Sequence, residues 1–254
     1  MFDALVDAGL RTTGLVFPGA AREVTDPGLA PGEELVRTAT AASGEEVALV
    51  TRPGPGHRAT VFLYGNAMVM ADTGPVRRVL GDDRATVVCV DYVGYGLSPG
   101  TPGEGGCYRA AHAAFDHAES LVGAGNVDVV GWSLGSAVAL ELATRRSPGR
   151  LVLLSPMSGV SGYVLSPLRL QGTPLRRLGP FAGVGRAARV RCDVLLVSGT
   201  DDRLTPTWMA RDLAAQFERR PGLRTELMLV DGAQHNDLFS YPQVWRRTLS
   251  FLSS

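Results

Sequence analysis

A serine flanked by glycines is the residue of this sequence best suited to act as a nucleophile. The segment Gly131-Trp132-Ser133-Leu134-Gly135 follows an apolar run at Val127–Val130 and precedes an amphipathic stretch at 134–146. A serine at a sharp turn from strand to helix has strained backbone angles, and flanking side chains would collide there, so the turn needs glycines. The same turn places the serine at the start of a helix, where backbone amides favour developing negative charge. We therefore predict that Ser133 is a nucleophile; the alternative is a tight structural turn.

A serine hydroxyl needs a base, and neutral imidazole is the suitable side chain near pH 7. The sequence contains four histidines, and only His235 follows the last predicted strand, Glu226–Val230. His112 and His117 fall within a predicted helix, and His57 falls within a loop rich in glycine and proline. We predict that His235 is the base; the alternative is a histidine of a surface loop.

The third group is a carboxylate that fixes the tautomer of the imidazole and stabilises the imidazolium. Asp201 and Asp202 directly follow the predicted strand Val194–Ser198. We favour Asp202 because it lies closer to the proline at which the loop returns to the next helix. Asp201 would then point elsewhere, and Asp231 is a further alternative because it lies close to the predicted base in the sequence.

The elements that must position these residues alternate between apolar and amphipathic stretches. Continuous apolar runs are typical of buried parallel strands covered by helices on both faces. The strand-length runs are Thr60–Tyr64, Thr86–Tyr92, Val127–Val130, Arg150–Leu154, Val194–Ser198 and Glu226–Val230. Helices are predicted near 72–81, 106–123, 134–146, 206–220 and 242–253, and an antiparallel hairpin over Glu34–Thr40 and Glu46–Arg52. We predict an α/β fold with a mostly parallel sheet of about eight strands, in which the three residues meet at the carboxyl edge.

Composition excludes several classes of protein. The 254 residues include 25 basic side chains, all of them arginine, so a Walker A loop, a pyridoxal Schiff base and a lysine nucleophile are ruled out. A net charge of zero argues against a nucleic-acid partner. The cysteines Cys89, Cys107 and Cys192 have no metal-binding or redox spacing, and we expect buried apolar side chains. We expect no metal and no organic cofactor.

The amino terminus carries acids where a signal peptide needs positive charge, and no apolar run approaches about 18 residues. We therefore expect a cytoplasmic protein without a transmembrane segment. Phe2, Leu5, Val6 and Leu10 are spaced as one face of a helix. That face could touch a lipid surface or gate a pocket, or it could pack on the protein's own core.

These residues and motifs resemble the α/β-hydrolase superfamily of serine hydrolases. Within it, the chain is similar to a branch of small esterases and protein depalmitoylases with a His-Gly-Asn-Ala-Gly-type oxyanion loop. The likeness covers roughly residues 35–254. The matching segments are Leu63-Tyr64-Gly65-Asn66-Ala67, Asp91-Tyr92-Val93-Gly94-Tyr95-Gly96-Leu97-Ser98-Pro99-Gly100, Gly131-Trp132-Ser133-Leu134-Gly135-Ser136, Gly199 to Pro206, and Gly232-Ala233-Gln234-His235-Asn236-Asp237.

The resemblance implies a role for each matching position. Ser133 would be the nucleophile, Asp202 the acid and His235 the base, and the amides of Asn66 and Leu134 would be the oxyanion donors. The chain departs from the branch at four positions, none of which removes a catalytic group. Tyr64 replaces a histidine, Val93 an arginine, Gln234 a glycine and Ser136 a glycine.

Residues 157–190 separate two predicted strands, and in this fold that position commonly holds a lid. We expect a single domain, 1–254, with 157–190 as a lid insertion; the alternative is a segment packed on itself. Tyr163 and Leu165, together with Tyr64 and Trp132, are candidates for contact with the substrate. The apolar residues of the insertion include Val160, Tyr163, Val164, Leu165, Leu168, Leu170, Leu175 and Phe181.

Charge is distributed unevenly along the chain. Residues 142–192 contain nine arginines and no acid, so this stretch carries a formal charge of +9. We hypothesise an anionic or carrier-linked substrate, such as a coenzyme A or phosphopantetheine thioester, or contact with an acidic membrane surface. Solvated arginines on a helical face are the alternative.

The sequence thus predicts a serine hydrolase that cleaves a small carboxylic ester or thioester through an acyl-enzyme. The same residues would also serve an acyltransferase, a cyclase or an enzyme that cleaves C–C bonds, because these differ in pocket shape and access of water. A non-catalytic binding module on the same scaffold is the remaining alternative.

Overall fold

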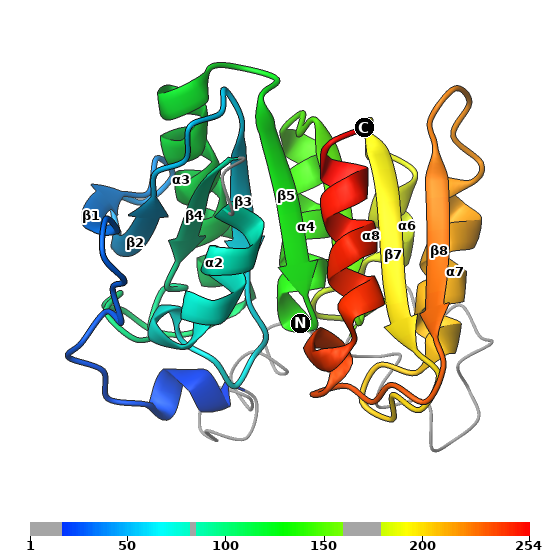
Figure 1. The fold of residues 1–254 in the computed structure, drawn as a ribbon. Coiled ribbons are helices and arrows are strands. Elements are labelled where there is room, and N and C mark those ends of the chain that lie inside the picture. Colours follow the sequence, from blue (N-terminus) through cyan, green and yellow to red (C-terminus); the bar gives the residue numbers. More distant parts are fainter. Residues whose placement is uncertain (1–16, 82–84, 160–178) are drawn as a thin grey trace. The chain divides into compact units, whose positions relative to one another are not determined.

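The computed structural model describes residues 17–81, 85–159 and 179–254 (Figure 1). It contains an eight-stranded sheet with the strand order β1-β2-β4-β3-β5-β6-β7-β8. The chain divides into two compact units, residues 1–128 and 129–254, each with its own strands and covering helices. The predicted α/β fold is confirmed: the sheet is mostly parallel, and its antiparallel strands lie at the amino-terminal end of the chain.

In the first unit, two parallel strands form the core. Every residue of β3 (Ala59–Leu63) and β4 (Thr86–Val90) is buried, which explains their continuous apolar sequences. The hairpin of β1 (Glu34–Ala39) and β2 (Glu46–Arg52) joins this pair through an antiparallel contact of β2 with β4. The helices α2 (Gly74–Gly81) and α3 (Glu104–Val122) cover opposite faces of β3 and β4 (Figure 1). Two 3-10 helices complete this unit, η1 (Pro18–Ala21) and η2 (Met70–Thr73).

In the second unit all the paired strands are parallel. They are β5 (Val127–Trp132), β6 (Arg150–Leu154), β7 (Asp193–Gly199) and β8 (Thr225–Val230). On one side lie α4 (Leu134–Arg145), α6 (Val184–Ala187) and α7 (Thr207–Phe217), and on the other side lies α8 (Pro242–Leu252) (Figure 1). A short 3-10 helix, η4 (Leu238–Ser240), precedes α8.

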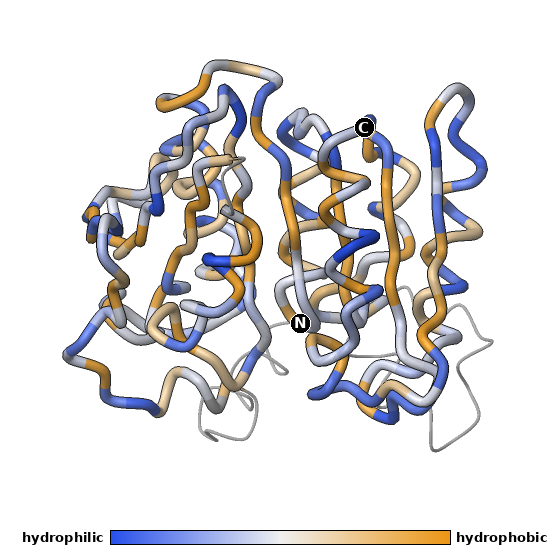
Figure 2. Tube along the Cα trace, in the orientation of Figure 1, coloured by the Kyte–Doolittle hydropathy of each residue, from blue (hydrophilic) through white to orange (hydrophobic). Residues whose placement is uncertain are grey.

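Parallel pairing brings the carboxyl ends of β5 to β8 to one edge of the sheet. The loops at that edge are more hydrophilic than the strands that lead into them, as Figure 2 shows for β7. Gly199, at the end of β7, lies so close to the Ala233 carbonyl that a Cβ atom there would clash with it. The glycine therefore allows the loops after β7 and β8 to approach each other.

Two predicted segments lie outside the described residues. They are the amino-terminal stripe of Phe2, Leu5, Val6 and Leu10, and residues 160–178 of the predicted lid. The candidates Tyr163 and Leu165 belong to the second of these segments. The single domain 1–254 with a lid at 157–190 stays a prediction. Among the described helices, none is long and apolar enough to cross a lipid bilayer.

Candidate active site

Ser133 occupies the turn between β5 and α4 with a φ of 54°. A non-glycine residue rarely adopts this left-handed backbone, and such strain is typical of functional positions. The Ser133 amide donates to the Leu154 carbonyl at 3.0 Å, which ties the turn to the end of β6. Before it, a Cβ atom on Gly131 would clash with the Gly135 carbonyl. The glycine therefore permits the close approach of strand and helix at the serine turn.

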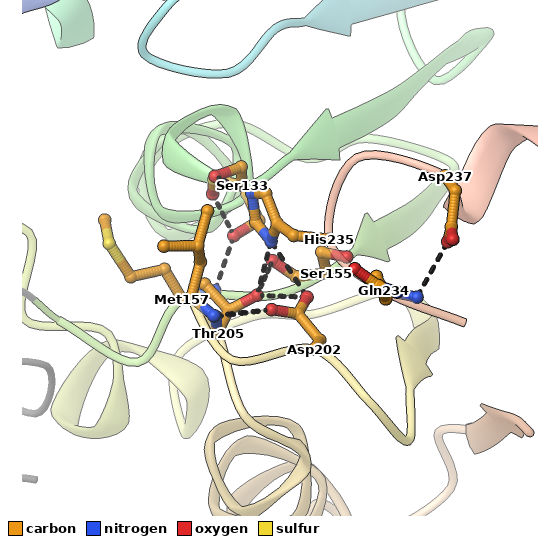
Figure 3. A network of polar contacts seen from close by, with 10 residues as sticks. Ser133, Ser155, Met157, Asp202, Thr205, Gln234, His235 and Asp237 are labelled. Carbon is orange, nitrogen blue, oxygen red and sulfur yellow. Dashed lines mark hydrogen bonds and ion pairs between the residues drawn. The ribbon is translucent and has the colours of Figure 1, made fainter. Parts of the chain in front are cut away.

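His235 links this serine to a carboxylate (Figure 3). Its Nε2 lies 2.9 Å from Ser133 Oγ, and its Nδ1 lies 2.8 Å from Asp202 Oδ2. With the hydrogen on Nδ1, the ring donates to Asp202 and accepts from the serine hydroxyl. The structure therefore brings together all three residues predicted from their positions after β5, β7 and β8.

The Asp202 carboxylate is buried and fully hydrogen-bonded. Its Oδ1 accepts from the amides of Leu204 at 2.9 Å and Thr205 at 2.7 Å, while Oδ2 accepts from the Thr205 hydroxyl and from His235. Burial by itself raises the pKa of Asp202, but the hydrogen bonds from His235 and Thr205 outweigh it, and the pKa lies below its ordinary value. The carboxylate is therefore an anion at neutral pH, as an orienting acid needs to be.

The competing candidates lie elsewhere. Asp201 is exposed, and the Asp231 carboxylate accepts from the Thr200 hydroxyl at 3.3 Å. In the first unit His57 is exposed, and His117 forms a hydrogen bond with the Thr51 hydroxyl. In the structure Asp202 contacts His235 and its exposed neighbour Asp201 does not, which agrees with the preference drawn from spacing.

Trp132, a candidate for substrate contact, packs against the imidazole. The centroids of the Trp132 and His235 rings are 5.5 Å apart, and Phe239 lies against the indole at 5.0 Å. Such contacts restrict the rotation of the imidazole about its side-chain bonds. Contact of Trp132 with a substrate stays a prediction, and its observed neighbours assign it a packing role as well.

Ser136, noted in the sequence only as a departure from glycine, has a structural role in the turn that was not predicted. The Ser136 hydroxyl donates to the Ser133 carbonyl at 2.5 Å and accepts from the Met157 amide at 2.9 Å. It therefore connects the serine turn with the chain that leaves β6, where the predicted lid begins. The departure from glycine at this position was visible in the sequence, but no local signal indicated its partner.

The predicted oxyanion donors, Asn66 and Leu134, belong to different units. Leu134 is the first residue of α4, and its amide belongs to the first four, which an α-helix leaves without an intrahelical acceptor. The loop residue Asn66 is held from two sides. Its carbonyl accepts from the Gly19 amide at 3.0 Å, and its side-chain Oδ1 accepts from the Tyr95 hydroxyl at 2.6 Å.

Tyr64 is placed differently from the substrate contact expected of it. The side chain has no exposed surface, and its hydroxyl donates to Asp91 Oδ1 at 2.7 Å. The Met70 amide donates to the same oxygen at 2.7 Å, so one carboxylate oxygen holds both ends of loop 65–69. A fully buried ring offers no face to a substrate. Tyr64 instead supports loop 65–69 through its hydrogen bond to Asp91.

Among residues 17–81, 85–159 and 179–254, no group of acids, histidines and cysteines is arranged to hold a metal ion. All three cysteines are free thiols and buried, as expected from their spacing. Burial raises the pKa of the Cys89 thiol to about 12, which leaves it protonated and unreactive. Ser133, by contrast, lies within hydrogen-bond distance of an imidazole.

Comparison with known proteins places this geometry in context. The model of a family described as "Alpha/beta hydrolase family" matches residues 47–187. An alpha/beta hydrolase domain-containing protein 17C of Xenopus tropicalis is 30% identical over 212 residues, which are 81% of this chain and 65% of the relative. An uncharacterized protein of Mycobacterium tuberculosis is 33% identical over 156 residues, 60% of this chain and 53% of the relative. The chain thus spans less than two thirds of these relatives.

Solved structures share the fold at low sequence identity. An esterase of Pyrococcus furiosus superposes with a TM-score of 0.71 at 18% identity, covering 91% of this chain and 96% of the esterase. A monoacylglycerol lipase of Paleococcus ferrophilus gives a TM-score of 0.63 at 20% identity, covering 86% of this chain and 98% of the lipase. Both comparisons support the same arrangement of strands and helices.

Proposed function

The chain belongs to the α/β-hydrolase family, and on this basis we propose that it cleaves a carboxylic ester or thioester through an acyl-enzyme. Hydrolase activity follows from the family, whereas the bond cleaved and the residues that cleave it are our proposal. The solved structures that share the fold include an esterase and a monoacylglycerol lipase, which supports an acyl substrate.

The chemistry follows from the order of the hydrogen bonds. His235 Nε2 removes the proton from Ser133 Oγ as this oxygen attacks the carbonyl carbon of the substrate. Asp202 accepts the hydrogen bond from Nδ1 throughout and stabilises the imidazolium. The imidazolium then protonates the leaving alcohol or thiol, and the acyl group stays on Ser133. A water molecule, deprotonated by His235, releases the acid and regenerates the serine.

The attack creates an oxyanion, for which we propose two backbone donors. The Leu134 amide lies directly after the nucleophile at the positive end of the α4 dipole. The Asn66 amide is the second donor, as the resemblance implies. Removal of one such donor typically lowers kcat by roughly 100–1000-fold.

The observation that carries this proposal is the unbroken hydrogen-bonded chain from Ser133 Oγ through His235 to the buried Asp202 carboxylate. The test is covalent labelling by a fluorophosphonate probe, followed by mass spectrometry of the labelled peptide. We expect labelling at Ser133 in the wild type, none in Ser133→Ala, and unchanged labelling in Ser240→Ala, which alters an exposed serine. Equal labelling of wild type and Ser133→Ala would refute the proposal.

A further inference from the structure

One threonine hydroxyl touches both the acid and the base of the site. Thr205 Oγ1 lies 2.8 Å from Asp202 Oδ2, 3.1 Å from His235 Nδ1 and 3.1 Å from the Ser155 carbonyl oxygen (Figure 3). The residue is only 4% exposed. It therefore joins the loop after β7, which carries the acid, to the ends of β6 and β8.

The Thr205 hydroxyl can donate only one hydrogen bond, and this limits the roles it can have. A hydroxyl has one hydrogen, which Thr205 can donate to Asp202 or to the Ser155 carbonyl, and two lone pairs, one of which can face His235. The two side-chain oxygens within hydrogen-bond distance of Nδ1, Asp202 Oδ2 and Thr205 Oγ1, can both accept from a single hydrogen on this nitrogen. They favour the tautomer with hydrogen on Nδ1, which leaves the Nε2 lone pair free for Ser133.

Ser155, which directly follows β6, is itself in a strained conformation. Ser155 has a φ of 43°, a left-handed backbone that usually requires glycine. Its amide donates to the Val197 carbonyl at 2.8 Å, so its position is fixed by β7. Strained residues persist where surrounding contacts over-determine them. Here the result is a carbonyl held in reach of the Thr205 hydroxyl.

We infer that Thr205 is a positioning residue of the proposed site, whose hydroxyl holds the Asp202 carboxylate and the Nδ1 edge of His235 together. The inference rests on the proposed function, since it assigns Thr205 a part in the same reaction. Thr205 acts through Asp202 and His235 and makes no contact with the reacting atoms.

The hydroxyl also moderates the charge that His235 experiences. When Thr205 donates to Asp202, part of the negative charge is taken up by that hydrogen bond. Asp202 is the ionised group in contact with His235; on the histidine's own loop, the Asp237 carboxylate accepts from the Gln234 amide. From the other packed elements, β5 contributes the uncharged Trp132 ring and Ser133. Nearby Asp201, Arg203 and Asp231 are exposed, so solvent screens their effect on the imidazole.

The test compares Thr205→Val with Thr205→Ser. Valine keeps the branched shape and loses the hydroxyl, so we expect kcat to fall about 10-fold with KM within about twofold. The acidic limb of the kcat/KM profile should move, because the hydroxyl that contacts both the Asp202 carboxylate and His235 Nδ1 is lost. Thr205→Ser should restore both kcat and the position of the acidic limb.

A matched control is Thr248→Val on α8. Thr248 is fully buried, and its hydroxyl has no partner among the described residues. The change should leave the pH profile where it is. A valine variant at 205 with wild-type kcat and an unmoved limb would overturn the inference, as would a serine variant that behaves like valine.

A second readout works without turnover. The proton on His235 Nδ1 gives a low-field NMR resonance, which Thr205→Val should shift and Thr205→Ser should leave close to its wild-type position. If Thr205→Val does not fold, Thr205→Cys keeps a weak donor in the same space, and an intermediate shift is expected. An unshifted resonance overturns the inference. If the wild type shows neither labelling nor turnover, the proposed function fails, and the resonance still decides whether Thr205 positions His235.

Discussion

At the scale of single residues, the environment of a carboxylate decides its role. Asp201 and Asp202 are neighbours with the same charge, yet one is exposed and the other is buried and hydrogen-bonded to four donors. Only the buried carboxylate reaches the imidazole. The donors compensate the cost of burial and keep the buried group ionised.

This difference predicts unequal effects of the same substitution. Asp202→Asn replaces the acceptor by an amide and favours the wrong tautomer of His235, so kcat should fall by roughly 10⁴-fold. Asp201→Asn is the matched control and should keep wild-type activity. Steady-state kinetics with a chromogenic ester provides the measurement, and comparable losses in the two variants would contradict the assignment.

At the scale of elements, close packing of strand and helix produces the serine turn. A Cβ atom added to Gly131 on β5 would clash with the Gly135 carbonyl and the Ala139 Cβ of α4. The helix therefore starts directly beyond the strand, and the left-handed Ser133 makes the connection. The turn depends on the absence of a side chain at Gly131 rather than on any particular contact.

We accordingly expect Gly131→Ala to displace the start of α4. Overpacking of this kind costs about 1–3 kcal/mol, and a shift of the serine should also remove most of the activity. Gly185→Ala on α6 is a suitable control, since a Cβ atom there meets nothing within 4 Å. Urea denaturation and ester hydrolysis should both be measured; an active, equally stable Gly131→Ala protein is the contrary outcome.

The loop at 65–69 depends on a buried polar cluster in the first unit. Asp91 Oδ1 accepts from the Tyr64 hydroxyl and the Met70 amide, and Tyr64 itself accepts from the Tyr92 amide at 3.3 Å. Burial raises the pKa of Asp91 and of Tyr64, so these groups are sensitive to the loss of any partner.

Tyr64→Phe should therefore lower the free energy of unfolding by about 1–3 kcal/mol, because it leaves buried polar atoms without a partner. Tyr108→Phe makes the same chemical change at a half-exposed bond to Glu104, where water can replace the hydroxyl. We expect the control to change stability by less than about 0.5 kcal/mol. Equal stability of the two variants in urea titrations would argue against this role.

At the scale of the whole molecule, charge is segregated along the chain although the total is zero. Nine arginines and no acid occur in residues 142–192, whereas residues 1–141 contain 17 acids and nine arginines. Some of the described arginines are neutralised locally, as Arg145 is by Glu141. Others, including Arg189 and Arg191, are exposed. Such a stretch would attract an anionic substrate over a distance of roughly 10 Å at moderate salt.

A comparison of thioesters tests this attraction. The acyl-coenzyme A and the neutral N-acetylcysteamine ester of one acyl group differ mainly in charge. We expect kcat/KM for the coenzyme A ester to fall several-fold between about 20 and 200 mM salt, with little change for the neutral ester. Identical responses of the two esters would disprove electrostatic attraction.

The residues with local signals were predictable from the sequence. Glycines around Ser133 and the position of His235 after the last strand depend on short-range geometry, and the strands followed from continuous apolar runs such as Thr86–Tyr92. The boundaries of the predicted strands and helices agree with the structure to within a few residues, whereas α6 (Val184–Ala187) was not predicted. Partners that are distant in the sequence left no such signal. Ser136 with Met157, and Thr205 with Ser155, become neighbours only in the folded chain.

The amino-acid sequence by itself determined the fold class, the serine turn and the order in which serine, acid and histidine follow their strands. Hydrophobic periodicity and the residue preferences of turns act over a few neighbouring residues, so they can be recognised directly in the amino-acid sequence. Only the tertiary structure decided that Asp202 rather than Asp201 reaches His235, and that Tyr64 is buried beneath a loop. Burial and hydrogen bonding depend on which strands become neighbours, and those contacts join residues far apart in the chain.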